Sequence, residues 1–187
     1  DFVKIFDYEL NLIDEEYVGT ILGQPAIFNN NIIFNSRIND KNYFFAYQFN
    51  NLNLKQGFNI TLNNDADFSG IKCLNLNNVN SCIFKDKLNY VHIVDIDSKT
   101  GSSYYTSAYN ETRQTVPAIG DIDNDGNLEA VWWFKDSGNY GFLVFDLSQR
   151  NIEWTIQNIF APFGPNYALK GQPVLVDLNN DNKLEIA

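Results

Sequence analysis

Short hydrophobic runs separated by turn-forming residues cover almost the whole chain. The runs are rich in Ile, Val, Phe and Tyr, and Asn, Asp, Gly, Ser and Pro separate them, as around residues 43–47, 90–96 and 141–145. β-Branched and aromatic residues favour strands, whereas the separating residue types favour turns. Because almost no segment has the 3.6-residue period of a helix, the pattern predicts an all-β protein built from many short strands.

The strand pattern repeats along the chain. A hydrophobic strand that ends in an acidic or polar residue occurs four times, ending at Asp7, Gln48, Asp97 and Asp146. A proline followed by a strand also recurs, at Pro25, Pro117 and Pro173. A repeat of about 40 to 55 residues with four short strands is typical of a β-propeller blade, whose open faces are buried when blades stack around an axis.

We therefore expect a single all-β region over residues 1–187, a β-propeller of four-stranded antiparallel blades. Full blades are predicted at about residues 24–62, 70–108 and 117–157, with half-blades at residues 1–20 and 173–187. Since the chain begins and ends in mid-blade, we expect part of a larger propeller, completed by the rest of a longer chain or by another subunit. A four-bladed ring closed by the two half-blades is the alternative.

The segment from Asp121 to Glu129, Asp-Ile-Asp-Asn-Asp-Gly-Asn-Leu-Glu, has the pattern of a metal-binding loop. Alternate residues of a tight turn point inward, and Gly126 allows the chain to reverse with a positive φ. The expected ligands are Asp121, Asp123, Asp125, the carbonyl group of Asn127, and Glu129. This flexible, charged, all-oxygen set suits Ca²⁺ better than Mg²⁺. A solvated acidic turn is the alternative interpretation.

A second copy of the loop lies 56 residues further on, from Asp177 to Glu185. Its residues match the first copy position for position, and the expected ligands are Asp177, Asn179, Asp181, the carbonyl group of Lys183, and Glu185. Asn182 replaces the glycine, and asparagine tolerates a left-handed backbone better than most residues. With one carboxylate fewer, the second site is expected to be weaker, so the sequence predicts about two Ca²⁺ sites of unequal affinity.

Residues 117–129, Pro-Ala-Ile-Gly-Asp-Ile-Asp-Asn-Asp-Gly-Asn-Leu-Glu, resemble the FG-GAP/VCBS repeat, the calcium-binding blade of integrin-α-type propellers. The resemblance implies that the loop joins the first two strands of a blade. The turn Asp97-Ser-Lys-Thr-Gly101 is similar to the blade turn of pyrroloquinoline-quinone-type propellers, in which Asp-x-x-Thr-Gly is followed three residues later by a docking tryptophan. Trp154 and Tyr105 hold that docking position after Asp146 and Asp97.

The two cysteines fit the same repeat. When residues 70–82 are laid over residues 117–129, Cys73 and Cys82 fall at the two ends of the calcium loop. We expect a disulfide between them, with two buried free thiols as the alternative. A disulfide would place the protein outside a reducing cytosol. The sequons at Asn59 and Asn110 are compatible with surface glycosylation. The expected location is therefore secreted or cell-surface.

The composition of the chain disfavours several classes of partner and function. Lys and Arg number 13 against 23 Asp and Glu, giving a net charge of −10, which disfavours nucleic-acid and membrane-surface partners. No apolar run reaches the roughly 20 residues of a membrane span, so no membrane insertion is expected within this segment. His92, the only histidine, is expected to be a packed strand residue. No catalytic residues are assigned, and we expect no enzyme activity.

The expected function is that of an extracellular, calcium-stabilised adhesion or ligand-binding module for a protein or a glycan. A structural component of the cell envelope or of a filament is one alternative, and the propeller of a polysaccharide-degrading enzyme is another. Trp132 and Trp133 are expected to face opposite sides of a blade as core residues, with a sugar-binding groove as the alternative for one of them. Residues 159–167 are the candidate recognition loop.

Overall fold

The computed structural model describes residues 1–50, 53–62, 69–106, 115–136, 139–157 and 172–187. All regular secondary structure in these segments is β, with sixteen strands. None of the described residues forms a helix that is long and apolar enough to cross a membrane. The expectation of an all-β protein is therefore confirmed for the described part of the chain.

The strands form five antiparallel sheets that follow one another in chain order. The first sheet pairs β1 (Phe2–Phe6) with β2 (Leu12–Tyr17). The second sheet has the order β3 (Thr20–Phe28), β4 (Asn31–Ile38), β5 (Lys41–Asn50) and β6 (Asn53–Leu62). The third sheet contains β7 (Lys72–Leu76), β8 (Val79–Lys85), β9 (Tyr90–Asp95) and β10 (Thr100–Tyr105). The fourth sheet contains β11 (Ala118–Gly120), β12 (Glu129–Asp136), β13 (Asn139–Asp146) and β14 (Asn151–Ile156), and the fifth pairs β15 (Leu175–Val176) with β16 (Glu185–Ile186).

Three of the five sheets are thus four-stranded meanders, as expected from the repeat. Their ranges, 20–62, 72–105 and 118–156, differ by at most four residues from the units predicted from the sequence. The two-stranded first and fifth sheets occupy the positions expected for the half-units, and in the described structure each consists of two strands that pair only with one another.

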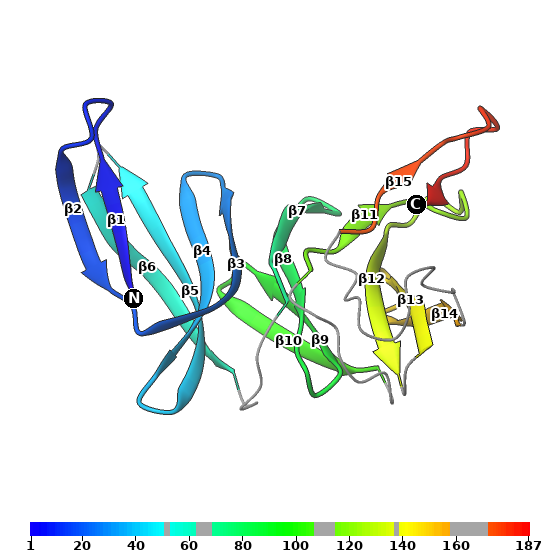
Figure 1. Ribbon diagram of the computed structural model, residues 1–187, viewed down its shortest axis with the longest axis horizontal. Helices are drawn as coiled ribbons and strands as arrows, with labels where there is room; N and C mark the ends of the chain where they lie inside the picture. The colour runs from blue at the N-terminus through cyan, green and yellow to red at the C-terminus, as the bar shows by residue number, and fades with distance from the viewer. Residues whose placement is uncertain (51–52, 63–68, 107–114, 137–138, 158–171) are drawn as a thin grey trace.

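Consecutive sheets pack face to face through four hydrophobic clusters, and Figure 1 shows the sheets in succession along the long axis of the molecule. Neighbouring residues of a central strand enter different clusters. In β5, Phe44 and Ala46 pack toward the third sheet, whereas Phe45 and Tyr47 pack toward the first sheet. Because side chains alternate across a strand, burial of both faces requires a continuous hydrophobic run. This explains why the central strands of each unit carry such runs.

The two adjacent tryptophans follow the same rule. Trp132 is fully buried in the cluster between the third and fourth sheets. Trp133 packs in the cluster between the fourth and fifth sheets, with its ring centroid 3.8 Å from that of Phe142. The expectation that both are core residues on opposite faces of one strand is confirmed.

The expected disulfide is present. Cys73 on β7 and Cys82 on β8 are directly opposed in the register of the two strands and form an S–S bond. Cys82 is fully buried in the cluster between the second and third sheets. The disulfide therefore joins the first two strands of the third sheet and also contributes to the packing of that sheet on its neighbour.

The turn of the third sheet begins two residues earlier than the sequence pattern indicated. The carboxylate of Asp95, rather than that of Asp97, accepts the N–H groups two and three residues further on, at 2.8 and 3.0 Å. Asp146 accepts the equivalent pair at 2.6 and 2.7 Å. The assignment of Asp97 as the counterpart of Asp146 was wrong because aspartate stands at both 95 and 97, and only strand register distinguishes them.

The docking aromatic of the third sheet changes with the turn. In the fourth sheet a β-bulge shifts β14 against β13, and Trp154 packs toward the fifth sheet. The β9–β10 pair has no such shift. As a result Tyr104 packs against Phe145 of the next sheet, whereas Tyr105, the residue expected there, is 61% exposed.

Candidate metal centre

The first acidic loop connects β11 to β12, the first two strands of the fourth sheet. Gly120 and Glu129 are cross-strand partners and close the loop at its base. The Asp121 carboxylate accepts the backbone N–H groups of Asp125 at 3.1 Å and Gly126 at 3.0 Å. Gly126 has a φ of 91°, in the region where a side chain is strained. The sequence thus forms a tight turn around its own first carboxylate.

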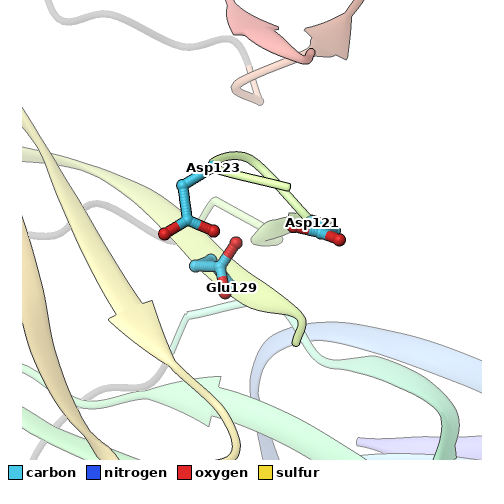
Figure 2. Close-up of side chains that lie close together, drawn as sticks. All are labelled: Asp121, Asp123 and Glu129. Atoms are coloured by element: carbon cyan, nitrogen blue, oxygen red, sulfur yellow. The ribbon is translucent and has the colours of Figure 1, made fainter. Parts of the chain in front are cut away.

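Three of the predicted ligand residues converge. The carboxylates of Asp121, Asp123 and Glu129 each offer an oxygen, and these oxygens lie within 4.8 Å of one another. Figure 2 shows the Asp121 and Asp123 side chains on the loop and Glu129 on the adjoining strand. Asp123 is exposed and Glu129 is buried. The cluster is therefore open to solvent on the loop side and closed on the sheet side.

The other two predicted ligand residues interact with each other. The Asp125 carboxylate accepts the backbone N–H of Asn127 at 2.7 Å and its side-chain amide at 2.8 Å. Asp125 is not a member of the three-carboxylate cluster. The structure therefore brings together Asp121, Asp123 and Glu129 as candidate ligands and gives Asp125 and Asn127 a role in shaping the turn.

The cluster disfavours its own negative charge in the absence of a cation. The pKa of Glu129 is raised from 4.5 to about 7, first by burial and then by the charges of Glu153, Asp123 and Asp121. A hydrogen bond from the Ile122 N–H, at 2.8 Å, opposes this increase of the pKa. A divalent cation would reverse the balance, because it stabilises the ionised carboxylates that now repel one another.

Glu153 lies near the loop, and the sequence pattern did not predict this neighbour. It lies on β14, and its pKa is raised by burial, by the charge of Asp123 and by a hydrogen bond with that side chain. Glu153 stands at the β-bulge where the pairing of β14 with β13 shifts by one residue. A bulge re-aims a side chain, and no feature of the linear pattern marked its position.

The second acidic loop, between β15 and β16, repeats the hydrogen bonds of the first. With the loops numbered 1 to 9 from Asp121 and from Asp177, the N–H groups of positions 5 and 6 donate to the carboxylate of position 1 in both loops. Position 5 also donates to the side chain of position 3, position 7 to that of position 5, and position 2 to the glutamate at position 9. The backbone φ is positive at positions 4 and 6 in both loops.

The two loops differ in their acidic content. Asn179 at position 3 donates its side-chain amide to Asp181 at 3.2 Å and to Glu185 at 3.3 Å. In the first loop the corresponding Asp123 belongs to the cluster of carboxylates. Among the described residues only the first loop contains three acidic groups that approach within 4.8 Å. The amide of Asn179 replaces the repulsion between carboxylates by internal hydrogen bonds.

The disulfide and the first acidic loop occupy equivalent positions in neighbouring sheets. Cys73 pairs with Cys82 in the third sheet as Gly120 pairs with Glu129 in the fourth. The overlay of the two units that suggested the disulfide is therefore correct in register. Of the two sequons, Asn59 is exposed on β6. Asn110 and the candidate recognition loop at 159–167 lie outside the described residues.

Two sequence comparisons with known proteins found no relative of this chain. A scan of the chain against protein-family models gives no match. A search of curated protein sequences gives no match either. The resemblance to the calcium-binding repeat therefore rests on the residues of the two acidic loops.

Proposed function

We propose that this chain forms part of a calcium-stabilised β-propeller of the FG-GAP/VCBS type, which acts outside the cell as an adhesion module for a protein or glycan ligand. The observation that carries the proposal is the repetition of one hydrogen-bonded, Asp-rich loop in the first hairpin of two consecutive units. Chance acidic turns have no reason to share both their register and their backbone conformation.

The packing of the sheets supports the propeller part of the proposal. In a propeller the first strands of successive blades approach one another near the axis. Here β3 contacts β7, and β11 contacts β15. The Ile71 N–H, just before β7, donates to the carbonyl group of Gln24 in β3 at 3.2 Å and so links the first strands of two units. A Cβ atom on Gly70 would lie 2.4 Å from Val116 and 3.1 Å from Gln24, so the first strand of the second unit and the segments that lead into the next two units lie close together.

This convergence can be tested with matched glycine variants. Gly70→Ala is expected to destabilise the protein by about 1–3 kcal/mol, because the added methyl group overpacks the contact with Val116. Gly101→Ala on β10 is the control, since its Cβ would meet neighbours at 3.5 Å or more. Equal unfolding free energies for the two variants would contradict the close packing of the three units at Gly70.

The calcium part is tested by thermal unfolding with and without a chelator. We expect Ca²⁺ to raise the melting temperature of the full chain, and Asp121→Ala combined with Asp177→Ala to abolish this response. Glu9→Ala, an exposed acidic residue near the β1–β2 turn, is the control and keeps the response. If the melting temperature does not respond to Ca²⁺ and elemental analysis finds no metal, the calcium proposal is wrong.

The disulfide supports the extracellular part, because such bonds persist where the surroundings are oxidising. The ligand class is tested with a glycan array probed in Ca²⁺ and in chelator. Binding to a defined glycan set, lost on chelation, is the expected result for a glycan ligand. No binding to any glycan would direct the search to protein partners at the surface of the native cell.

A further inference from the structure

Three side chains in or next to the third sheet are joined by hydrogen bonds, and none of them belongs to the acidic loops. His92 on β9 and Ser103 on β10 are cross-strand partners. The imidazole Nδ1 lies 2.8 Å from the Ser103 hydroxyl oxygen, and Nε2 lies 3.0 Å from Oδ2 of Asp86. The order serine, histidine, aspartate is that of a nucleophile with its base and the group that orients the base.

The surroundings hold the imidazole in one orientation. The His92 side chain is 2% exposed and that of Asp86 is fully buried. The Phe84 ring stacks against the imidazole with the centroids 4.8 Å apart. The second oxygen of Asp86 accepts the backbone N–H of Tyr90 at 2.8 Å, which prevents the carboxylate from turning away.

The hydrogen bonds also assign the proton positions. An ionised carboxylate is only an acceptor, so the proton of the Asp86 contact belongs to Nε2 of His92. Nδ1 then carries a lone pair, and the Ser103 hydroxyl donates to it. Lys85, next to Asp86 in the chain, is buried, and the Asp86 charge opposes the effect of burial that lowers the Lys85 pKa to about 8. A cation in this position favours an ionised Asp86.

Ser103 is the accessible end of the chain of hydrogen bonds. It lies on β10, the edge strand of the third sheet, and is exposed, whereas its two partners are buried. A reagent can therefore reach the Ser103 hydroxyl from solvent, while the base behind it is shielded from water. An exposed hydroxyl with a buried, oriented base is the arrangement that activates a serine for nucleophilic attack.

We propose that Ser103 is a nucleophile activated by His92, with Asp86 as the positioning residue, and that it takes activated acyl or phosphonyl groups. With an alkyl fluorophosphonate, the Ser103 oxygen forms a bond to phosphorus and the P–F bond breaks. Fluoride leaves with the bonding electron pair, and the hydroxyl proton moves to Nδ1 of His92. The imidazolium that forms keeps this proton and is stabilised by the Asp86 carboxylate against which it lies. This activity is separate from the proposed calcium-dependent binding.

Fluorophosphonate labelling of the full chain, followed by intact-mass and peptide mass spectrometry, tests the nucleophile. Fluoride leaves without an acid catalyst, so the labelling tests the nucleophile and its base without requiring a proton donor for the leaving group. We expect a single adduct on Ser103, absent from Ser103→Ala and retained in Ser102→Ala, an exposed neighbour on the same strand. His92→Gln should lower the labelling rate constant at least about 100-fold. Labelling of Ser103→Ala at the wild-type rate, or no labelling of the wild type, would overturn the proposal.

The positioning role of Asp86 is tested separately, by nuclear magnetic resonance. Because the chain contains one histidine, ¹⁵N-labelled histidine reports only on His92. The wild type should show the tautomer with the proton on Nε2, and Asp86→Asn should shift the population toward the other tautomer and slow labelling. Wild-type imidazole protonated on Nδ1 would contradict the assigned roles, whether or not Asp86→Asn folds.

Discussion

In the third and fourth sheets, the same pair of facing positions in the first hairpin is occupied by different chemical groups. In the third sheet a disulfide joins Cys73 to Cys82, and in the fourth an acidic loop turns back on Glu129. The covalent bond needs no ligand and introduces no charge. The acidic loop brings carboxylates together, and burial followed by the charges of nearby carboxylates raises the pKa of Glu129. The first hairpin of the second sheet has neither feature, because β3 and β4 are joined by the short turn between Phe28 and Asn31. The comparison therefore shows one hairpin position with two different closures in neighbouring sheets.

The largest loss of stability should come from removing the disulfide. Replacing both Cys73 and Cys82 by serine is expected to cost about 2–4 kcal/mol of unfolding free energy, because the unfolded chain regains the freedom that the closed loop restricts. Denaturant unfolding measures this loss. The increase of the melting temperature caused by Ca²⁺ should remain in the double variant. A loss of the calcium response would show that the two hairpins are not independent.

The next largest loss of stability should come from disrupting the acidic loops, and the two loops should contribute unequally. At Ca²⁺ concentrations about 100-fold above the dissociation constant, one site stabilises the fold by about 2.7 kcal/mol. Asp121→Ala should remove the larger share of the calcium stabilisation and Asp177→Ala the smaller share, since Asn179 replaces a carboxylate in the second loop. Calcium titrations followed by differential scanning calorimetry compare the two variants. Equal losses would contradict the ranking of the sites.

A pH dependence should distinguish the acidic hairpin from the disulfide hairpin. The Glu129 pKa is raised to about 7 in the fold, so the metal-free folded state binds this proton more tightly than the unfolded chain. Stability contributed by this group is therefore lost as pH rises from 4.5 to about 7. Ca²⁺ binds the ionised form, so its effect on the melting temperature should grow over the same range.

Glu129→Gln separates these two consequences of the Glu129 charge. The variant should raise the metal-free melting temperature at pH 8, because it removes a buried negative charge from the cluster, and it should weaken the calcium response. Thermal unfolding at pH 5 and pH 8, with chelator and with Ca²⁺, measures both. A variant that is less stable than the wild type in chelator at pH 8 would show that the hydrogen bonds of Glu129 outweigh the repulsion between the carboxylates.

The smallest change in unfolding free energy should come from substitutions at the positive-φ positions of the loops. Gly126 has a φ of 91° and Asn182, at the same loop position, has a φ of 67°. Gly126→Ala is expected to cost about 1 kcal/mol, because a Cβ atom is strained in this region. Asn182→Gly should change the stability by only a few tenths of a kcal/mol, since asparagine tolerates the conformation. Equal effects, measured by denaturant unfolding, would contradict the equivalence of the two turns.

The features that the sequence predicted are those with a period or a fixed spacing. The alternation of side chains reveals central strands with two buried faces, and the overlay of two units placed Cys73 opposite Cys82. The features that it missed depend on register. Glu153 reaches the acidic loop because of a bulge, and Ser103 lies beside His92 because β10 pairs without one. A single extra residue in a strand exchanges its faces, and no composition rule marks where that residue stands.

Calcium binding by the two acidic loops can be measured directly, by flow dialysis of the metal-free protein against radioactive Ca²⁺. Calcium binding by both loops predicts two bound ions per chain with unequal affinities, one in Asp121→Ala and one in Asp177→Ala, and none when both substitutions are combined. Wild-type protein that retains no Ca²⁺ at millimolar concentration, or a double variant that retains as much as the wild type, would contradict it.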